Sequence, residues 1–259
     1  TLVLMVGVID LSVGGVICVI NSLAAVAMPD SGIGIFLFCI GCIAIGLAIG
    51  AFNGVIVTKF NVQPFIVTFT VNYILLGISQ LILDRDGGAP AKAFTKALTV
   101  KFGPISLGVI IVLLILVAWG YLRRTKFIRD VFAVGTNAKA SAMNGINVVR
   151  VKMITFALSG GCAALAGLWR TAQLASGSPT AGDALTTPTL TISVIGGTSM
   201  MGGVGGMFGT VVGAYILRII SDLLTFLGTK SFWSTVFQGI FLVATVVVCS
   251  IIDKKNRSK

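Results

Sequence analysis

Long apolar runs separated by short polar segments dominate the chain and predict a helical membrane protein. A helix that crosses a bilayer needs roughly 20 predominantly apolar residues, and runs near that length recur along the whole sequence. They are Leu11–Met28, Ile33–Thr58, Phe65–Leu83, Ile105–Leu122, Met153–Leu174, Pro188–Ile220 and Trp233–Ile252. We therefore expect an all-α fold, a polytopic transmembrane helical bundle that forms a single domain over residues 1–259.

Two of the apolar segments do not fit a simple span. The first nine residues, TLVLMVGVI, are too few to cross a bilayer and lack the features of a signal peptide, so we expect them to be the end of a preceding helix in an N-terminally truncated chain. The run Pro188–Ile220 is longer than one span, and helix parity requires it to turn back midway. The predicted turn is Gly196–Gly206, GGTSMMGGVGG, because glycine permits irregular backbone.

The composition supports a membrane protein and excludes most enzyme chemistry. Hydrophobic residues make up 56% of the chain, charged residues only 10%, and the mean hydropathy is +1.04, whereas soluble domains carry about 25% charged residues. The chain has no histidine and no glutamate, which excludes a Ser-His-Asp triad, and it has no P-loop motif for ATP. We expect no catalytic residues, no cofactor and no metal.

The five cysteines all lie within predicted spans, so they are poor candidates for a disulfide framework. Cys39 and Cys42 form a CxxC pair inside an apolar run, without further Cys or any His nearby. We interpret them as small buried residues.

The net charge of +11 predicts an orientation in the membrane. Its basic residues lie at the edges of the spans instead of alternating with aromatics, so we expect no nucleic-acid partner. Between Arg123 and Lys152 seven basic residues face one acid, and the tail adds Lys254, Lys255, Arg257 and Lys259. The positive-inside rule places both segments, and hence the C-terminus, in the cytoplasm. Residues 84–104 and 175–187 then lie outside, although the first carries Arg85, Lys92, Lys96 and Lys101.

Small and uncharged polar residues recur inside the spans. Stripes of glycine at four-residue spacing, such as Gly46, Gly50 and Gly54, predict close helix contacts. The polar side chains are either interhelical hydrogen-bonding groups or the lining of a pathway for a neutral, hydroxyl-rich solute, and their number includes Asn21, Thr191 and Gln238. As substrate-pathway residues we select Asn53, Asn72, Gln80 and Ser193. Candidate proton-carrying residues in the membrane interior are limited to the acids Asp10 and Asp222, which argues against proton-coupled transport.

The segment Phe132–Val149, FAVGTNAKASAMNGINVV, is rich in small residues and amides within an otherwise membrane-like chain. Asn137 is a good N-cap and Gly145 fits the position after a helix end, so the letters AKASAM predict a helix of about two turns. Such a helix is roughly 10 Å long, too short to span. It is either a plain surface connector or an element that inserts into a groove on a partner.

Four separated motifs resemble the ribose-type permeases of bacterial ATP-binding-cassette sugar importers. They are IDLSVGG at Ile9–Gly15, AVGTNAKASAMNGINVVRVK at Ala133–Lys152, PTAG at Pro179–Gly182 and IGGTSMMGGVGGMFGTVVGA at Ile195–Ala214. The resemblance runs in matching order over essentially the whole chain. It implies a multi-pass subunit of the bacterial cytoplasmic membrane that translocates a simple sugar.

The resemblance also implies partners. In addition to membrane lipid, these are a second permease copy or homologue, two ATP-binding subunits in the cytoplasm, and an extracytoplasmic solute-binding protein. In such importers a short cytoplasmic helix docks on the ATPase, and the matching positions are Gly135, Asn137, Ala140, Gly145 and Ile146. Segments such as ILDRDGGAPAKAF and LTTPTLTISV depart from the ribose pattern. Permeases for other sugars, nucleosides or branched-chain amino acids stay open, as does a self-sufficient secondary transporter or channel.

Overall fold

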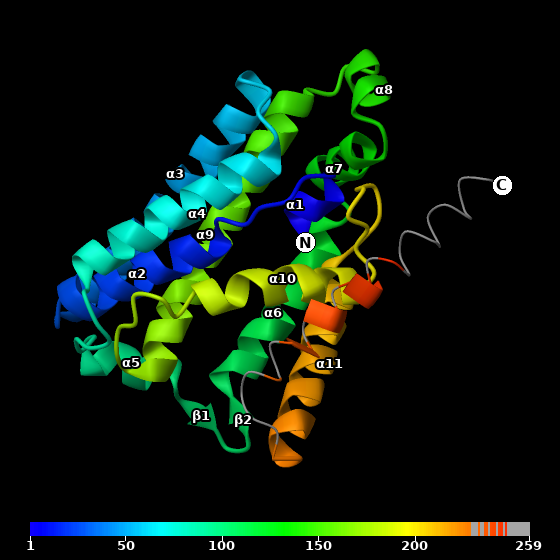
Figure 1. The fold of residues 1–259 in the computed structure, drawn as a ribbon. Coiled ribbons are helices and arrows are strands. Elements are labelled where there is room, and N and C mark those ends of the chain that lie inside the picture. The colour runs from blue at the N-terminus through cyan, green and yellow to red at the C-terminus, as the bar shows by residue number, and fades with distance from the viewer. Residues whose placement is uncertain (229–232, 234–235, 238, 242, 246, 248–259) are drawn as a thin grey trace. The chain divides into compact units, whose positions relative to one another are not determined.

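The computed structural model describes residues 1–228, 233, 236–237, 239–241, 243–245 and 247. Within them the chain is almost entirely helical (Figure 1). The helices are α1 Leu2–Met5, α2 Val13–Ala27, α3 Gly32–Lys59, α4 Pro64–Ile82, α5 Lys92–Leu98, α6 Leu107–Leu122, α7 Lys126–Thr136, α8 Ala138–Met143, α9 Val148–Leu174, α10 Asp183–Ile195 and α11 Met207–Phe226. A hairpin of two-residue strands, β1 Lys101–Phe102 and β2 Ile105–Ser106, precedes α6. The predicted all-α fold is confirmed.

Among the described residues, four helices, α3, α4, α9 and α11, are long and apolar enough to cross a membrane, and α6 with α7 would make a fifth if the pair forms one broken span. The predicted spans match α3 and α4 to within one residue at either end. Helix α9 begins five residues before the predicted span, because Asn147 caps it by accepting a hydrogen bond from the N–H of Arg150 at 2.9 Å. Half of the span predicted at Trp233–Ile252 lies outside the described residues, as do Gln238, Cys249 and the basic tail.

One predicted span needs correction, and two segments contain elements that the sequence analysis did not describe. The first predicted span is shorter than expected, because Asp10 and Ser12 form a turn and α2 holds only 15 residues. The outer segment at residues 175–187 is partly helical, since α10 begins at Asp183 and continues through Pro188. The segment at residues 84–104 contains α5 and β1. Pattern reading missed α5 and α7 because neither is a long apolar run.

The chain divides into two compact units. Unit 1 comprises Thr1–Val8, Trp119–Ile146 and Thr187–Lys259, and unit 2 comprises Ile9–Ala118 and Asn147–Thr186. The prediction of a single domain stays a prediction. The thiols of Cys18, Cys39, Cys42 and Cys162 are free in the described part of the chain; Cys42 is buried as interpreted, whereas Cys39 is only half-buried.

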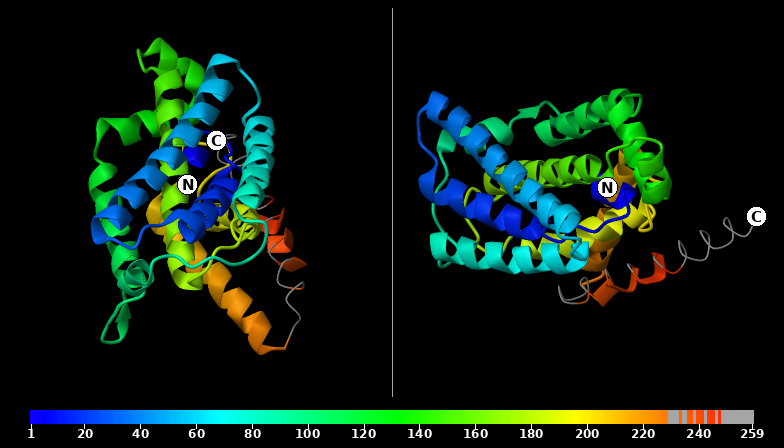
Figure 2. Two further views of the ribbon diagram at one scale, coloured as in Figure 1. Left: turned by 90° about the vertical axis from the view of Figure 1, so that its left-hand side faces the viewer. Right: turned by 90° about the horizontal axis from the view of Figure 1, so that it is seen from above.

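In unit 2, α3 packs along α9, and α2 packs against both α9 and α4 (Figure 2). The glycine stripe of α3 forms the contact between α3 and α9. A Cβ on Gly46 would overlap the carbonyl oxygen of Gly160, and a Cβ on Gly54 would lie 2.9 Å from the Cα of Met153. On the next face of α9, Gly167 approaches the carbonyl oxygen of Ile17. The backbones therefore approach as closely as the small-residue stripes predicted.

In unit 1, too, helices pack closely at glycine residues. Helix α10 and helix α11 are joined by the segment 196–206, where the sequence predicted a turn. Gly197, Gly202 and Gly203 have φ angles of +80°, +84° and +78°, values that side-chain-bearing residues rarely adopt. Gly209 and Gly213 of α11 contact Gly196 and Ile192. Residues 196–206 thus join two helices, and the prediction that the chain turns back here within the membrane stays a prediction.

Candidate functional site

Helix α8 is the first candidate site, and local sequence alone accounts for it. The side-chain oxygen of Asn137 accepts a hydrogen bond from the N–H of Ala140 at 3.0 Å, which caps the start of the helix. At its end, Gly145 has a φ of +79°. The N–H of Gly145 donates to the carbonyl of Ala142 and that of Ile146 to the carbonyl of Ser141, each at 3.0 Å. These two bonds form a Schellman motif, so α8 is fixed at both ends.

Most of the five residues selected from the sequence fix the ends of α8 and do not form its exposed surface. Asn137, Gly145 and Ile146 make the two caps. Gly135 lies in α7, where a Cβ would overlap the carbonyl oxygen of Met5 and lie 2.5 Å from the N of Gly203. Ala140 is half-buried. Gly135 therefore lets α7 approach two backbone segments of unit 1.

Asn137 and Gly145 are exposed at the two ends of α8, and the remaining exposed residues of this element are ones that sequence reasoning did not select. Ser141 is buried, whereas Lys139, Ala142 and Asn144 are exposed and Met143 is 83% exposed. The signal that could have identified Met143 is its place as the one large apolar side chain in AKASAM. An exposed methionine is an adaptable apolar contact, so α8 presents a small surface suited to a partner.

The second candidate site is a set of buried polar groups around α2 in unit 2. Asn72 of α4 is 4% exposed, and its side-chain oxygen accepts a hydrogen bond from the N–H of Gly15 at 2.7 Å. Its side-chain nitrogen donates to Asp183 at 3.5 Å. Asn53 of α3 is fully buried and donates to the hydroxyl of Ser12 at 2.8 Å. Two of the selected amides thus contact the same short segment, which carries the IDLSVGG motif.

The other two selected residues are placed differently. Gln80 is exposed on α4. Ser193 belongs to unit 1, where it is 3% exposed, donates to the carbonyl of Thr189 at 3.0 Å and lies 3.2 Å from the hydroxyl of Thr1. The structure brings Asn53 and Asn72 to one segment and does not bring Gln80 to them.

Further along α2, polar side chains hold the PTAG segment. The side-chain oxygen of Asn21 accepts a hydrogen bond from the N–H of Ser178 at 2.5 Å, and its nitrogen donates to Thr171 at 2.8 Å. Ser79 donates to the carbonyl of Pro179 at 3.0 Å. The Asn21–Thr171 bond joins α2 to α9, and the other two bonds fix the segment between α9 and α10.

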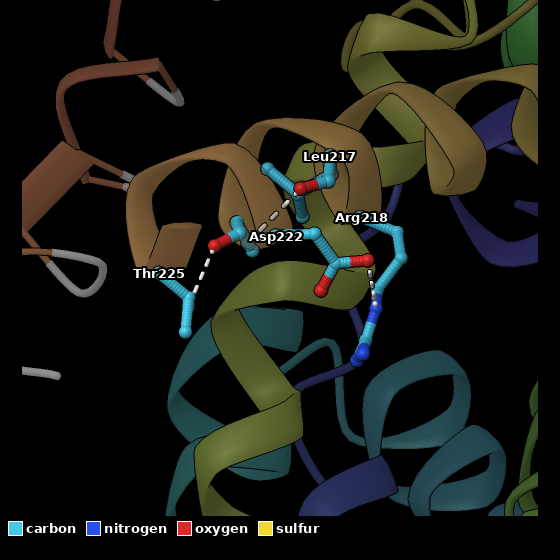
Figure 3. A network of polar contacts seen from close by, with 5 residues as sticks. Leu217, Arg218, Asp222 and Thr225 are labelled. Atoms are coloured by element: carbon cyan, nitrogen blue, oxygen red, sulfur yellow. Dashed lines mark hydrogen bonds and ion pairs between the residues drawn. The ribbon is translucent and has the colours of Figure 1, made fainter. Parts of the chain in front are cut away.

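Helix α11 carries an ion pair on its surface (Figure 3). The Nε of Arg218 lies 3.0 Å from the carboxylate of Asp222, and the two side chains are 76% and 59% exposed. Ser221 and Thr225 donate to the carbonyls of Leu217 and Ser221, at 3.0 and 2.9 Å. Both hydroxyls are therefore satisfied within the helix.

Among the residues that the structure describes, no cluster of three or more His, Cys, Asp or Glu could hold a metal.

Comparison with known proteins identifies relatives over nearly the whole chain. Residues 1–246 match the family model of the branched-chain amino acid transport system permease component. The ribose import permease protein of Haemophilus influenzae is 33% identical over 99% of this chain and 81% of its own length. The D-allose transport system permease protein of Escherichia coli is 32% identical over 97% and 78%.

The galactose/methyl galactoside import permease protein of Salmonella typhimurium is 32% identical over 80% of this chain and 65% of its own length. No solved structure matches the chain significantly.

Proposed function

Since the chain belongs to the family of the branched-chain amino acid transport system permease component, we propose that it forms the membrane pathway of an ATP-driven importer for a ribose-like monosaccharide. Membership makes it a multi-pass membrane protein and a non-catalytic permease of the ATP-binding-cassette sugar-importer type. The three relatives carry the names of ribose, D-allose and galactose permeases, and this range supports a simple sugar without selecting one.

The observation that carries the proposal is α8. A six-residue helix with a cap at each end and an exposed Met143 is suited to docking on a separate ATP-binding subunit in the cytoplasm. Asn137, Ala140, Gly145 and Ile146 make the end caps of this helix, Gly135 lets the preceding α7 pack closely, and the partner contacts the face around Met143. Closure of the ATP-binding subunits would then act on the permease through α8.

Two further partners complete the proposed importer. An extracytoplasmic solute-binding protein delivers the sugar, and a second permease copy or a homologue completes the pathway. The basic segment Arg123–Lys152, which contains α8, lies in the cytoplasm together with the C-terminus, in agreement with the positive-inside rule.

We place the solute near the buried amides. Amides suit the hydroxyl groups of a neutral sugar, because they both donate and accept hydrogen bonds. Asn53 and Asn72 both contact the segment Asp10–Gly15 and are the strongest pathway candidates. Gln80 and Ser193 stay in the proposed set, although neither shares this contact.

The test is uptake by vesicles that contain the full-length permease and its native partners. Uptake of labelled ribose, allose and galactose is compared with and without ATP supplied on the side of the membrane that carries the ATP-binding subunits. Accumulation of one sugar that requires ATP supports the proposal. Uptake driven by an ion gradient without ATP would support the alternative, a secondary transporter.

A further inference from the structure

Asp10, at the N-terminal end of α2, is a buried acid whose hydrogen-bonding neighbours are neutral. Its side chain is 6% exposed. One carboxylate oxygen accepts hydrogen bonds from the N–H and the hydroxyl of Ser12, at 3.0 and 2.6 Å. The other accepts from the hydroxyl of Ser159 at 2.7 Å. Both carboxylate oxygens are therefore hydrogen-bonded, and none of these partners carries a positive charge.

Among the described residues no Lys or Arg forms a direct ion pair with Asp10, and the ion pair found joins Arg218 to Asp222. Ser12 is the N-cap of α2, and the start of a helix supplies roughly half a positive charge. That partial charge does not neutralise a carboxylate. The cluster of Asp10, Ser12 and Ser159 therefore carries net negative charge in the interior of unit 2.

Asn53 supplies the second observation. It is fully buried, and its side-chain nitrogen donates to the hydroxyl of Ser12 at 2.8 Å. Its side-chain oxygen is buried and has no hydrogen-bond partner. An unpaired buried amide oxygen is unfavourable and uncommon in folded proteins. An unpaired acceptor thus belongs to the same side chain that contacts the negative cluster.

We propose that Asp10, Ser12, Asn53 and Ser159 form a binding site for a small monovalent cation. The site offers only oxygen ligands, which hard cations prefer. One carboxylate balances one positive charge, whereas calcium sites usually combine several carboxylates. The ion neutralises Asp10, accepts the free oxygen of Asn53 as a ligand, and ties the start of α2 to α3 and α9.

The experiment is thermal unfolding of the purified full-length permease in NaCl, KCl or choline chloride at equal ionic strength, without sugar. Because an ion that binds only the folded protein stabilises it by mass action, Tm should rise with Na⁺ or K⁺, saturate, and stay low in choline. Asp10→Asn should abolish the rise, and Ser159→Ala should shift it to higher ion concentration. Asp30→Asn removes one exposed charge in the same unit and should keep the rise.

Equal Tm values in all three salts would overturn the proposal and leave Asp10 as a cap of α2. A rise that persists in Asp10→Asn would overturn it too, because the ion would then bind elsewhere. If Asp10→Asn does not fold, the ion concentration for half-maximal Tm shift in Ser159→Ala decides the question: an unchanged value contradicts the site. The assay needs no sugar and no ATP, so its result is independent of the proposed transport function.

Discussion

Gly50 of α3 and Phe156 of α9 approach so closely that a Cβ on Gly50 would overlap the carbonyl oxygen of Phe156. In a lipid environment the apolar faces of helices gain little from mutual burial, and close backbone packing provides the contact energy instead. This pair therefore lies at the centre of the α3–α9 contact, the most extensive helix pairing in unit 2.

Replacing this glycine should destabilise unit 2. Gly50→Ala introduces a methyl group where backbone atoms already stand, and overpacking of this kind costs about 1–3 kcal/mol. Gly41→Ala is the matched control, because it lies on the same helix with no atom within 4 Å of the added Cβ. Thermal unfolding in detergent should show a lower Tm for Gly50→Ala alone. Equal Tm values for the two variants would contradict the packing described.

Asn72→Ala should lower sugar uptake while the permease still associates with its ATP-binding subunit, since the residue lies in unit 2 and α8 belongs to unit 1. Uptake in vesicles and recovery of the ATP-binding subunit are measured on the same preparation. Gln173→Ala serves as a control for an exposed amide of α9. Unchanged uptake in Asn72→Ala would remove this residue from the pathway.

The Arg218–Asp222 pair of α11 predicts a non-additive effect. If both charges lie within a membrane-crossing helix, removal of Arg218 leaves an unpaired carboxylate, which is costly there. Arg218→Leu alone should therefore reduce the amount of inserted protein more than Arg218→Leu combined with Asp222→Leu. Quantification of protein in the membrane fraction checks this. A double variant at least as impaired as the single one would show that the pair lies in water.

The sequence predicted those parts of the fold that depend on neighbouring residues. Helices α3 and α4 are long apolar runs, Ser31 caps the first and Pro64 opens the second. Helix α8 follows from Asn137 and Gly145 in the same way. Helices α5 and α7 escaped detection because they are seven and eleven residues long and carry basic residues.

The candidate sites were less accessible to sequence reasoning. Selection of Asn53 and Asn72 as buried polar residues depends on residue type and position within an apolar run. Their contact with one segment depends on how α3, α4 and the start of α2 pack, which involves residues 41 and 57 positions apart. Helical periodicity in a uniformly apolar helix does not show which face is buried, and for that reason Gln80 was grouped with them.

The central claim is that α8 docks on a separate ATP-binding subunit. Met143→Asp places a charge on the exposed face of α8 and spares the caps made by Asn137 and Gly145, so the helix should stay intact. Ala97→Asp introduces the same charge on exposed α5 and is the control.

The decisive measurement is recovery of the ATP-binding subunit when the full-length permease is purified from its native membrane in mild detergent. The account predicts recovery with the unmodified protein and with Ala97→Asp, and loss with Met143→Asp at equal permease yield. Equal recovery with Met143→Asp, or a permease that purifies without any ATP-binding subunit, would contradict it.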